Sequence, residues 1–392
     1  GTPLWTPHLS DRSGEAEESM FEFNGTASYS IKNQARCISA LEGDTDHNTF
    51  LLASLVLRDD NELHVVNFNE DTNEVWCRRI YQHPHEVWGC ITCPAPENME
   101  LLITTHANGT EQRTSLWRMT SLSERETAPE AGQQAAPIPM RMPELLQLGP
   151  PRKLGDSRGV LWNTVLPEQI ACVNRSLVQL YQLSHGGVAS SAAESGSASS
   201  PHGATFSCGR WDPHHAHALG LGCDRALMML DTRTLKTAQW VNDAHEQRVR
   251  GMDFNPNKPN VLLSSGDDYR MCFWDLRKPG QPLRTERAHS HWVTTASYNR
   301  FHDQLVLSSG TDCLVKLWRA ASISSAPPSL DLEEDVGEGE ADGLVKLFED
   351  HEQSVFGAVW SAADAWIFAS LSLDGKAAIN HVPPAEKYKI LL

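Results

Sequence analysis

No run of the sequence approaches the roughly 18 to 20 consecutive apolar residues that a membrane-spanning helix requires. The first twenty residues lack the basic segment and the apolar core of a secretory signal. The nine cysteines are odd in number and lack the dense spacing of a disulfide scaffold. These absences predict a protein of the reducing cytosol without a membrane anchor.

Basic residues are also scarce. The 392 residues include 33 Lys and Arg against 50 Asp and Glu, which gives a formal net charge of −17. A surface with this charge repels phosphate backbones and anionic lipid headgroups. We therefore expect neither nucleic-acid binding nor direct membrane insertion.

Two common nucleotide-binding motifs are missing, namely the G-x-x-x-x-G-K-[ST] loop and the G-x-G-x-x-G pattern. Cys90 and Cys93 form a CxxC pair, but a zinc site needs a second pair at comparable spacing, so we interpret both as core-strand residues. His214, His215 and His217 show no cluster of carboxylate or thiolate partners in the sequence. The sequence therefore predicts a protein that is not an enzyme and has no catalytic residue, cofactor or metal.

Helical periodicity is nearly absent, and short apolar runs alternate with turn residues, which predicts an all-β fold. Three segments near 120–139, 184–204 and 320–343 are rich in Ser, Ala, Gly, Pro or acid. They contain too few apolar side chains to offset the entropy of ordering, so we expect flexible insertions. The third carries seven acids between Asp331 and Asp342, which indicates a solvated loop or, alternatively, an electrostatic docking tail.

A repeated pattern organises the rest of the chain. His-x-x-x-Val starts at His83, His245, His289 and His351, and an aromatic residue follows the last three valines by five positions. Further along, a Ser, an Asp four residues later and a Trp six residues beyond that recur at a spacing of 44 residues, from Trp274 to Trp318. This spacing matches the roughly 40 to 45 residues of a four-stranded propeller blade. The fold is expected to be a seven-bladed β-propeller over 29–392, after a flexible segment at 1–28.

The repeated polar residues have a structural explanation. An Asp in a tight turn can accept a hydrogen bond from the preceding His, and a strand Ser with a Trp indole can complete a buried chain. A nucleophilic site would occur once, whereas this arrangement recurs, so we interpret it as a peg that locks each blade. The predicted pegs are His245, Ser264, Asp268 and Trp274, then His289, Ser308, Asp312 and Trp318, then His351, Ser370 and Asp374.

These anchors also predict the blade boundaries. The closing blade needs an outer strand, which either the stretch at 27–31 or the tail at 387–392 can supply. Residues 1–19 are expected to be dispensable, with Met20 as a plausible initiator. The expected blades are 35–82, 83–119, 140–183, 206–231, 245–287, 288–319 and 344–392.

The repeats resemble WD40 propellers, and several stretches indicate one family of them. These stretches are GRWDPHH at 209–215, AHEQRVRGMDFNPNKP at 244–259, SSGDDYRMCFWDLR at 264–277 and KYKILL at the end. They are similar to the family of proteins that interact with the EARP and GARP vesicle-tethering complexes. The resemblance implies a monomeric, non-enzymatic adaptor in a larger assembly, cytoplasmic and peripheral at the trans-Golgi network and endosomes. It also implies tether recruitment to membranes, endosomal recycling, endosome-to-Golgi retrograde transport and cargo sorting to dense-core vesicles.

Strand alternation predicts a partner-binding set. Residues on either side of the motif Val share one face of the innermost strand, because side chains alternate with period two. In WD40 propellers such positions surround the narrower mouth of the channel, and Trp and Arg are enriched in binding hot spots. The set is Glu86, Trp88, Arg248, Arg250, Trp292, Thr294, Ser354 and Phe356.

A second function class competes with this one. Asp231 with Arg233 and Asp275 with Arg277 form Asp-x-Arg pairs at the ends of two successive blades. They resemble the WDxR boxes of substrate receptors for cullin-RING ubiquitin ligases, in which the Arg contacts the ligase adaptor. The other interpretation is an ordinary turn with a local ion pair.

Overall fold

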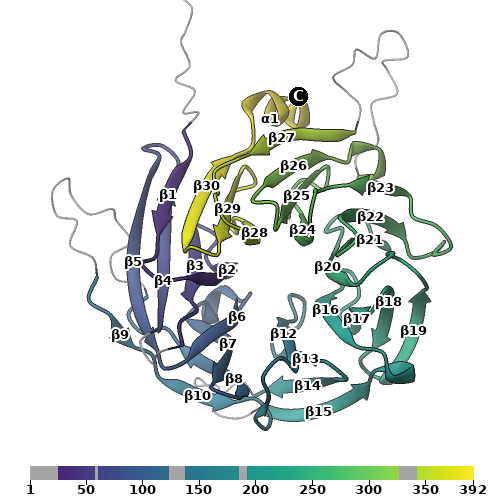
Figure 1. The fold of residues 1–392 in the computed structure, drawn as a ribbon, viewed down its shortest axis with the longest axis horizontal. Helices are drawn as coiled ribbons and strands as arrows, with labels where there is room; N and C mark the ends of the chain where they lie inside the picture. The colour runs from purple at the N-terminus through teal and green to yellow at the C-terminus, as the bar shows by residue number, and fades with distance from the viewer. Residues whose placement is uncertain (1–24, 58–60, 123–136, 185–191, 326–341) are drawn as a thin grey trace, which may run out of the picture.

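A computed structural model describes residues 25–57, 61–122, 137–184, 192–325 and 342–392. Seven sheets follow one another around a central opening, and each begins at its innermost strand (Figure 1). The fold class is thereby confirmed as a seven-bladed β-propeller.

Blades one and two are tied together by the segment that follows the first insertion. Blade one contains β2 (Ala35–Ala40), β3 (Asn48–Ser54), β4 (Asn61–Asn69) and β5 (Glu74–His83). Blade two contains β6 (Glu86–Thr92), β7 (Leu101–Asn108), β8 (Glu111–Arg118), β10 (Glu144–Gln147) and the short β11 (Arg152–Lys153). Between them, β9 (Met140–Arg141) runs parallel to β5 as a fifth strand of blade one.

The next three blades are regular four-stranded sheets. Blade three contains β12 (Ser157–Trp162), β13 (Gln169–Asn174), β14 (Leu177–Leu183) and β15 (Ala192–Ser199). Blade four contains β16 (Phe206–Trp211), β17 (Ala218–Cys223), β18 (Ala226–Asp231) and β19 (Lys236–Val241). Blade five contains β20 (Val249–Phe254), β21 (Val261–Gly266), β22 (Arg270–Asp275) and β23 (Arg284–Arg287).

The last two blades complete the ring. Blade six contains β24 (Val293–Tyr298), β25 (Leu305–Gly310), β26 (Val315–Arg319) and β27 (Gly343–Phe348). Blade seven contains β28 (Val355–Trp360), β29 (Ile367–Ser372), β30 (Lys376–His381) and β1 (Ala27–Ser30). Among the described residues, the helical elements are α1 (Pro384–Leu391) and the 3₁₀ turns η1 (Pro96–Asn98), η2 (Pro201–Gly203) and η3 (Ala321–Ile323).

The insertion expected at 184–204 is partly wrong. Within it, β15 pairs with β14 from Leu183↔Ala192 to Leu177↔Ser199. An outer strand is held by backbone hydrogen bonds, so it forms without the apolar side chains on which the prediction depended. In the other two insertions, 123–136 and 326–341 lie outside the described residues, whereas η3 and Leu122 are ordered parts of the fold.

The predicted blade boundaries are also corrected at two places. Blade three begins at 157 and not 140, because residues 140–153 pair with β5 and β8 of the first two blades. Residues 343–348 complete blade six as β27, so blade seven begins at Val355. In both places a long insertion separates an outer strand from its own blade in the sequence.

The ring is closed by the strand near the N-terminus. β1 pairs antiparallel with β30, from Ala27↔Ile379 to Ser30↔Lys376. The tail, which was the other candidate, forms α1 with Pro384 in its first turn, a position that suits proline. Ala27 and Ser28 therefore belong to the propeller and not to the expected flexible segment, of which 1–24 lie outside the described residues.

Removing residues 1–19 is expected to leave the thermal midpoint unchanged, whereas removing residues 1–32 should lower it. The longer deletion removes all backbone pairing of β1 and the bond from Ile31 N to Gly375 O at 2.9 Å. It also removes the Ile31 side chain, which is 3% exposed. Thermal unfolding of both truncated chains tests this, and equal midpoints for the two would contradict it.

Adjacent blades bury their apolar faces against each other, and this stacking forms the core. Between blades five and six, Phe273 contacts Tyr298 edge to face at a ring-centroid distance of 6.2 Å, and Val306 and Trp318 join the same cluster. Phe254, Tyr298 and Trp360, the aromatic residues five positions after the motif valines, are all buried. The innermost strands are therefore held rigidly from both sides.

Candidate partner-binding site at the channel mouth

Blades five and six contain complete hydrogen-bonded pegs. His245 Nε2 lies 2.8 Å from Ser264 Oγ, which accepts from Trp274 Nε1 at 2.9 Å. His245 Nδ1 lies 3.0 Å from an Asp268 carboxylate oxygen and is assigned as the donor, because an ionised carboxylate only accepts.

Blade six repeats the arrangement through His289 and its three partners. His289 Nε2 lies 2.9 Å from Ser308 Oγ, which accepts from Trp318 Nε1 at 2.9 Å, and His289 Nδ1 lies 2.9 Å from Asp312. Both pegs lie beside the first residue of the innermost strand. They fix the loop that leads to the channel.

Blade seven departs from the predicted peg. His351 contacts Ser370 and Ser372 at 2.8 Å each, and Asp374 is reached only through the Ser372 hydroxyl. In blade five the corresponding position is Gly266, where a Cβ would lie 2.6 Å from His245 Nδ1. A serine at this position therefore places its hydroxyl between the His and the Asp.

Blade two has a peg that the sequence analysis missed. His83 Nε2 lies 3.1 Å from Thr104 Oγ1, which accepts from Trp117 Nε1 at 2.8 Å. Burial lowers the pKa of His83 to about 4. In this blade Thr104 replaces the Ser of the motif, and a longer hairpin separates it from Trp117. The Ser-to-Trp spacing of blades five and six therefore does not reveal this peg, although His83 and Trp117 are both present.

Every innermost strand has a β-bulge at the same position, directly after its first paired or buried residue. In each case the register skips a single residue, which a bulge leaves unpaired and turns away from the regular alternation. Each blade thus presents one residue at the same level of the channel. We call these residues the bulge ring: Arg36, Trp88, Arg158, Ser207, Arg250, Thr294 and Phe356.

A cavity of about 390 Å³ lies at this mouth between blades one, five, six and seven. Five of the eight predicted partner-binding residues line it, and the structure adds three others. The predicted ones are Arg250, Trp292, Thr294, Ser354 and Phe356, and the additional ones are Arg36, His291 and Thr311.

Arginine side chains stack on the aromatic residues of the mouth. The Arg36 guanidinium lies 4.4 Å from the Phe356 ring centroid and 5.4 Å from that of Trp88, so it links blades seven, one and two. Arg250 lies 4.7 Å from the Trp292 ring centroid. Cation–π contacts of this kind hold both guanidinium groups at the mouth, and Arg250 also donates from Nε to Asp267.

The remaining predicted residues have different surroundings. Trp88 does not line the cavity itself but contacts Arg36, which does. Its Nε1 donates to Glu86 at 3.3 Å. Arg248 does not line the cavity; its charge acts on Arg158 and Cys208 of blades three and four. Thr294 Oγ1 donates to Val355 O at 2.8 Å, so this side chain joins blades six and seven.

Arg36, Arg158 and Ser207 were missed because blades one, three and four lack the His-x-x-x-Val motif. A different signal was present in two of these blades. Trp162 and Trp211 follow Ser157 and Phe206 by five residues, as the aromatic residues follow the motif valines in blades five to seven. Blade one has Ala40 at this position and offers no such signal.

The opposite mouth of the channel carries a second cavity of about 270 Å³. Arg210 Nε lies 2.9 Å from Asp253, and Arg300 lies 2.5 Å from Glu42. Burial raises the pKa of Asp253 despite the charge of Arg210. These pairs connect different blades, so the charges at this mouth balance one another.

The alternative ligase contacts are local ion pairs in the structure. Arg277 donates from Nε to Asp275 at 2.9 Å, and Arg233 donates from its backbone N to Asp231 at 2.9 Å. Both side chains are exposed and lie after the third strand of their blades, at the face opposite the bulge ring.

Within the described ranges no cluster of three or more His, Cys, Asp or Glu has an arrangement that could hold a metal ion. His215 Nδ1 lies 2.9 Å from Asp212 within the same turn, and His214 Nε2 lies 2.9 Å from Asn255 O of blade five. Cys90 and Cys93 are free thiols in and after β6. The described helices also include none with the length and apolar character needed to cross a bilayer.

One catalytic pattern escaped the sequence analysis. Gly155–Gly159 matches the G-x-S-x-G nucleophile elbow, which requires a sharp turn from a strand into a helix. Here Ser157 begins β12 and pairs with Asn174 in an antiparallel sheet, and the chain continues as a strand. The match therefore lacks the geometry of a nucleophile.

The comparisons with known proteins agree with this architecture. The model of the EIPR1 β-propeller family matches residues 24–318. The chain belongs to this family. EARP and GARP complex-interacting protein 1 of Homo sapiens is 33% identical over 384 residues, which cover 93% of this chain and 98% of that protein.

Two further relatives are similar to this chain over nearly their whole length. The EARP-interacting protein homolog of Gekko japonicus is 32% identical over 386 residues, with 93% of this chain and 98% of that protein covered. The WD repeat-containing protein DWA2 of Arabidopsis thaliana is 28% identical over 357 residues, with 91% and 96% covered. Since 91 to 93% of this chain is covered in these comparisons, the similarity extends beyond residues 24–318, which the family model matches.

Proposed function

We propose that this EIPR1-family propeller is a non-enzymatic adaptor that binds subunits of the EARP and GARP tethering complexes through the mouth that carries the bulge ring. The observation that carries the proposal is the grouping of Trp88, Arg250, Trp292 and Phe356, from four different blades, around one opening. Large aromatic residues and arginines dominate binding hot spots. The names of the relatives supply the identity of the partner.

The same proposal places the protein in membrane traffic. An adaptor that holds these tethers would act at the cytoplasmic side of the trans-Golgi network and endosomes. It would support tether recruitment there, and with it endosomal recycling, retrograde transport to the Golgi and dense-core vesicle cargo sorting. Within the adaptor the propeller acts as a monomeric unit.

Affinity capture from cells with the tagged chain tests the proposal. We expect EARP and GARP subunits to dominate the captured proteins. The chain with Arg233→Ala and Arg277→Ala is the matched control, because both exposed arginines lie away from the bulge ring. Capture of a cullin-ligase adaptor in place of the tethers, and its loss in this double variant, would replace the proposal with the ligase function.

A further inference from the structure

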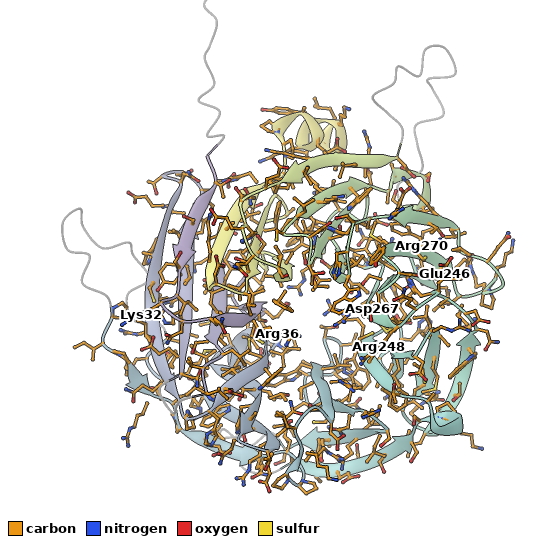
Figure 2. The ribbon with its side chains drawn as sticks, viewed as in Figure 1. Lys32, Arg36, Glu246, Arg248, Asp267 and Arg270 are labelled. Atoms are coloured by element: carbon orange, nitrogen blue, oxygen red, sulfur yellow. The ribbon has the colours of Figure 1, made fainter. Side chains whose placement is uncertain are left out.

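The channel mouth concentrates positive charge in an otherwise acidic protein. Arg36, Arg158 and Arg250 belong to the bulge ring, and Arg248 lies two residues before Arg250. In Figure 2, Arg36 and Arg248 lie on opposite sides of the central opening. The whole chain carries a formal net charge of −17, so this surface contrasts with the rest of the molecule.

Most of these guanidinium groups lack an acidic partner. Arg250 forms an ion pair with Asp267, whereas no carboxylate among the described residues pairs with Arg36, Arg158 or Arg248. Arg158 Nε is buried and has no hydrogen-bond partner in the described part of the chain. Taking a charged donor out of water without an acceptor is costly, so an anion beside the half-buried Arg158 guanidinium would be stabilising.

The arginines also act on one another. Burial lowers the pKa of Arg158, and the charges of Arg248, Arg175 and Arg250 lower it further. Burial likewise lowers the pKa of Arg36, to which the charge of Arg250 contributes. Two nearby carboxylates neutralise little of this positive charge. Glu86 accepts a hydrogen bond from Trp88, and Asp156 makes no ion pair with Arg158. An anion bound between these groups would relieve their repulsion.

We infer that the mouth binds an extended acidic peptide segment of the protein partner, with its Asp and Glu carboxylates held by Arg36, Arg158 and Arg248. That the partner is a tether subunit rests on the proposed function; the chemistry of the segment rests on the arginines. Guanidinium groups bind carboxylates in bidentate geometry, and stacking on Trp88 and Phe356 orients the Arg36 fork in advance.

A nucleic acid fits this surface less well than a peptide. Bases bind to open aromatic faces, but guanidinium groups already occupy faces of Phe356 and Trp292. The net charge of the chain also repels a polyphosphate backbone at a distance, whereas a short acidic segment meets only the mouth.

The probe for the experiment is a short fluorescein-labelled peptide of alternating Asp, Glu and Gly, compared with the same peptide carrying Asn and Gln. Fluorescence anisotropy with the full chain measures both affinities. We expect the acidic peptide to bind more tightly than the amide peptide, and its affinity to fall as ionic strength rises, because the Debye length shortens to about 8 Å at physiological salt.

Two double variants with the same change of charge locate the site. Arg158→Gln with Arg248→Gln should weaken acidic-peptide binding about tenfold or more, since two charge-assisted contacts are lost. Arg233→Gln with Arg277→Gln should leave it unchanged, because those arginines lie on the opposite face. Circular dichroism verifies folding; if the first double variant does not fold, Arg248→Gln alone should produce a smaller loss.

Several results would overturn the inference: equal binding of the amide peptide, equal losses in both double variants, or equally tight binding of a single-stranded oligonucleotide. The double variant Arg158→Gln with Arg248→Gln separates the two proposals. If this variant no longer binds the peptide but still captures the tethers at the parental level, the inference is refuted while the proposed function stands. Peptide binding without tether capture by the parent would refute the proposed function instead.

Discussion

Trp292→Ala is expected to lower the affinity for the tether partner about thirtyfold, which corresponds to the roughly 2 kcal/mol of a binding hot spot. Trp292 is 40% exposed, lines the mouth cavity and stacks on Arg250 at 4.7 Å. Its removal takes away an aromatic contact surface and releases the Arg250 guanidinium. Because the side chain lies outside the core, stability should change little. Quantitative capture of tether subunits at a series of bait concentrations measures the effect.

Phe301→Ala is the matched control for this variant. Phe301 is 47% exposed and follows β24, at the opposite end of the same innermost strand. Its removal should leave capture near the parental level. A folded Trp292→Ala protein that captures EARP and GARP subunits as well as the parent does would refute the mouth as the binding site.

Asp312→Ala should cost about 1 to 3 kcal/mol of unfolding free energy, because it leaves the buried His289 Nδ1 without its acceptor. The carboxylate accepts from His289 Nδ1 and from the backbone N–H of Ser290 at 2.9 Å each. Asp374→Ala is the matched control and should cost less, because the exposed Asp374 reaches His351 only through Ser372. Chemical denaturation of the three chains measures the difference. Equal losses in the two variants would contradict the structural role of the direct His–Asp contact.

The same variant has a pH signature. Burial raises the pKa of Asp312, but the hydrogen bond and charge of His289 outweigh this and lower the pKa to about 2. The folded pKa therefore lies below the unfolded value of about 3.9, so the carboxylate stabilises the fold above that pH and loses its contribution as the pH falls through about 2. Between these values the parent should lose stability more steeply than Asp312→Ala does. Parallel curves for the two chains would show that Asp312 does not couple protonation to folding.

The pegs show which contacts a sequence pattern can predict. His245 with Asp268 and His289 with Asp312 were predictable, because fixed spacing between strands of one hairpin fixes the geometry. Ser372 altered the third peg, because Gly266 and Gly310 in blades five and six have no side chain to separate the His from the Asp, whereas the Ser372 hydroxyl lies between His351 and Asp374. Blade two formed a peg with Thr104 although its spacing differs. The size of the side chain at the position of Ser372 therefore decides whether the His of a peg contacts the Asp directly.

The residues of the channel mouth were also only partly predictable from the sequence. The motif valines located Trp88, Arg250, Thr294 and Phe356 in the sequence, and alternation along a strand placed them on one face. Their neighbours Glu86 and Arg248 fit the same alternation but lie outside the cavity. Trp292 and Ser354 hold the same position before their valines and do line the cavity, so this position does not decide which residues reach it. Alternation alone therefore identified a set of residues but not their arrangement.

The number of blades, the pegs of blades five and six and the family were predictable from the sequence, because they depend on residue spacing within single blades. Tertiary structure decided that β1 and not the tail closes the ring, since both segments have strand character and only pairing with β30 separates them. It also decided that Arg36 and Arg158 reach the mouth. A bulge is a property of backbone pairing and accepts Arg, Trp, Ser, Thr or Phe, so no residue type marks its position, and residues from seven blades meet only when the ring closes.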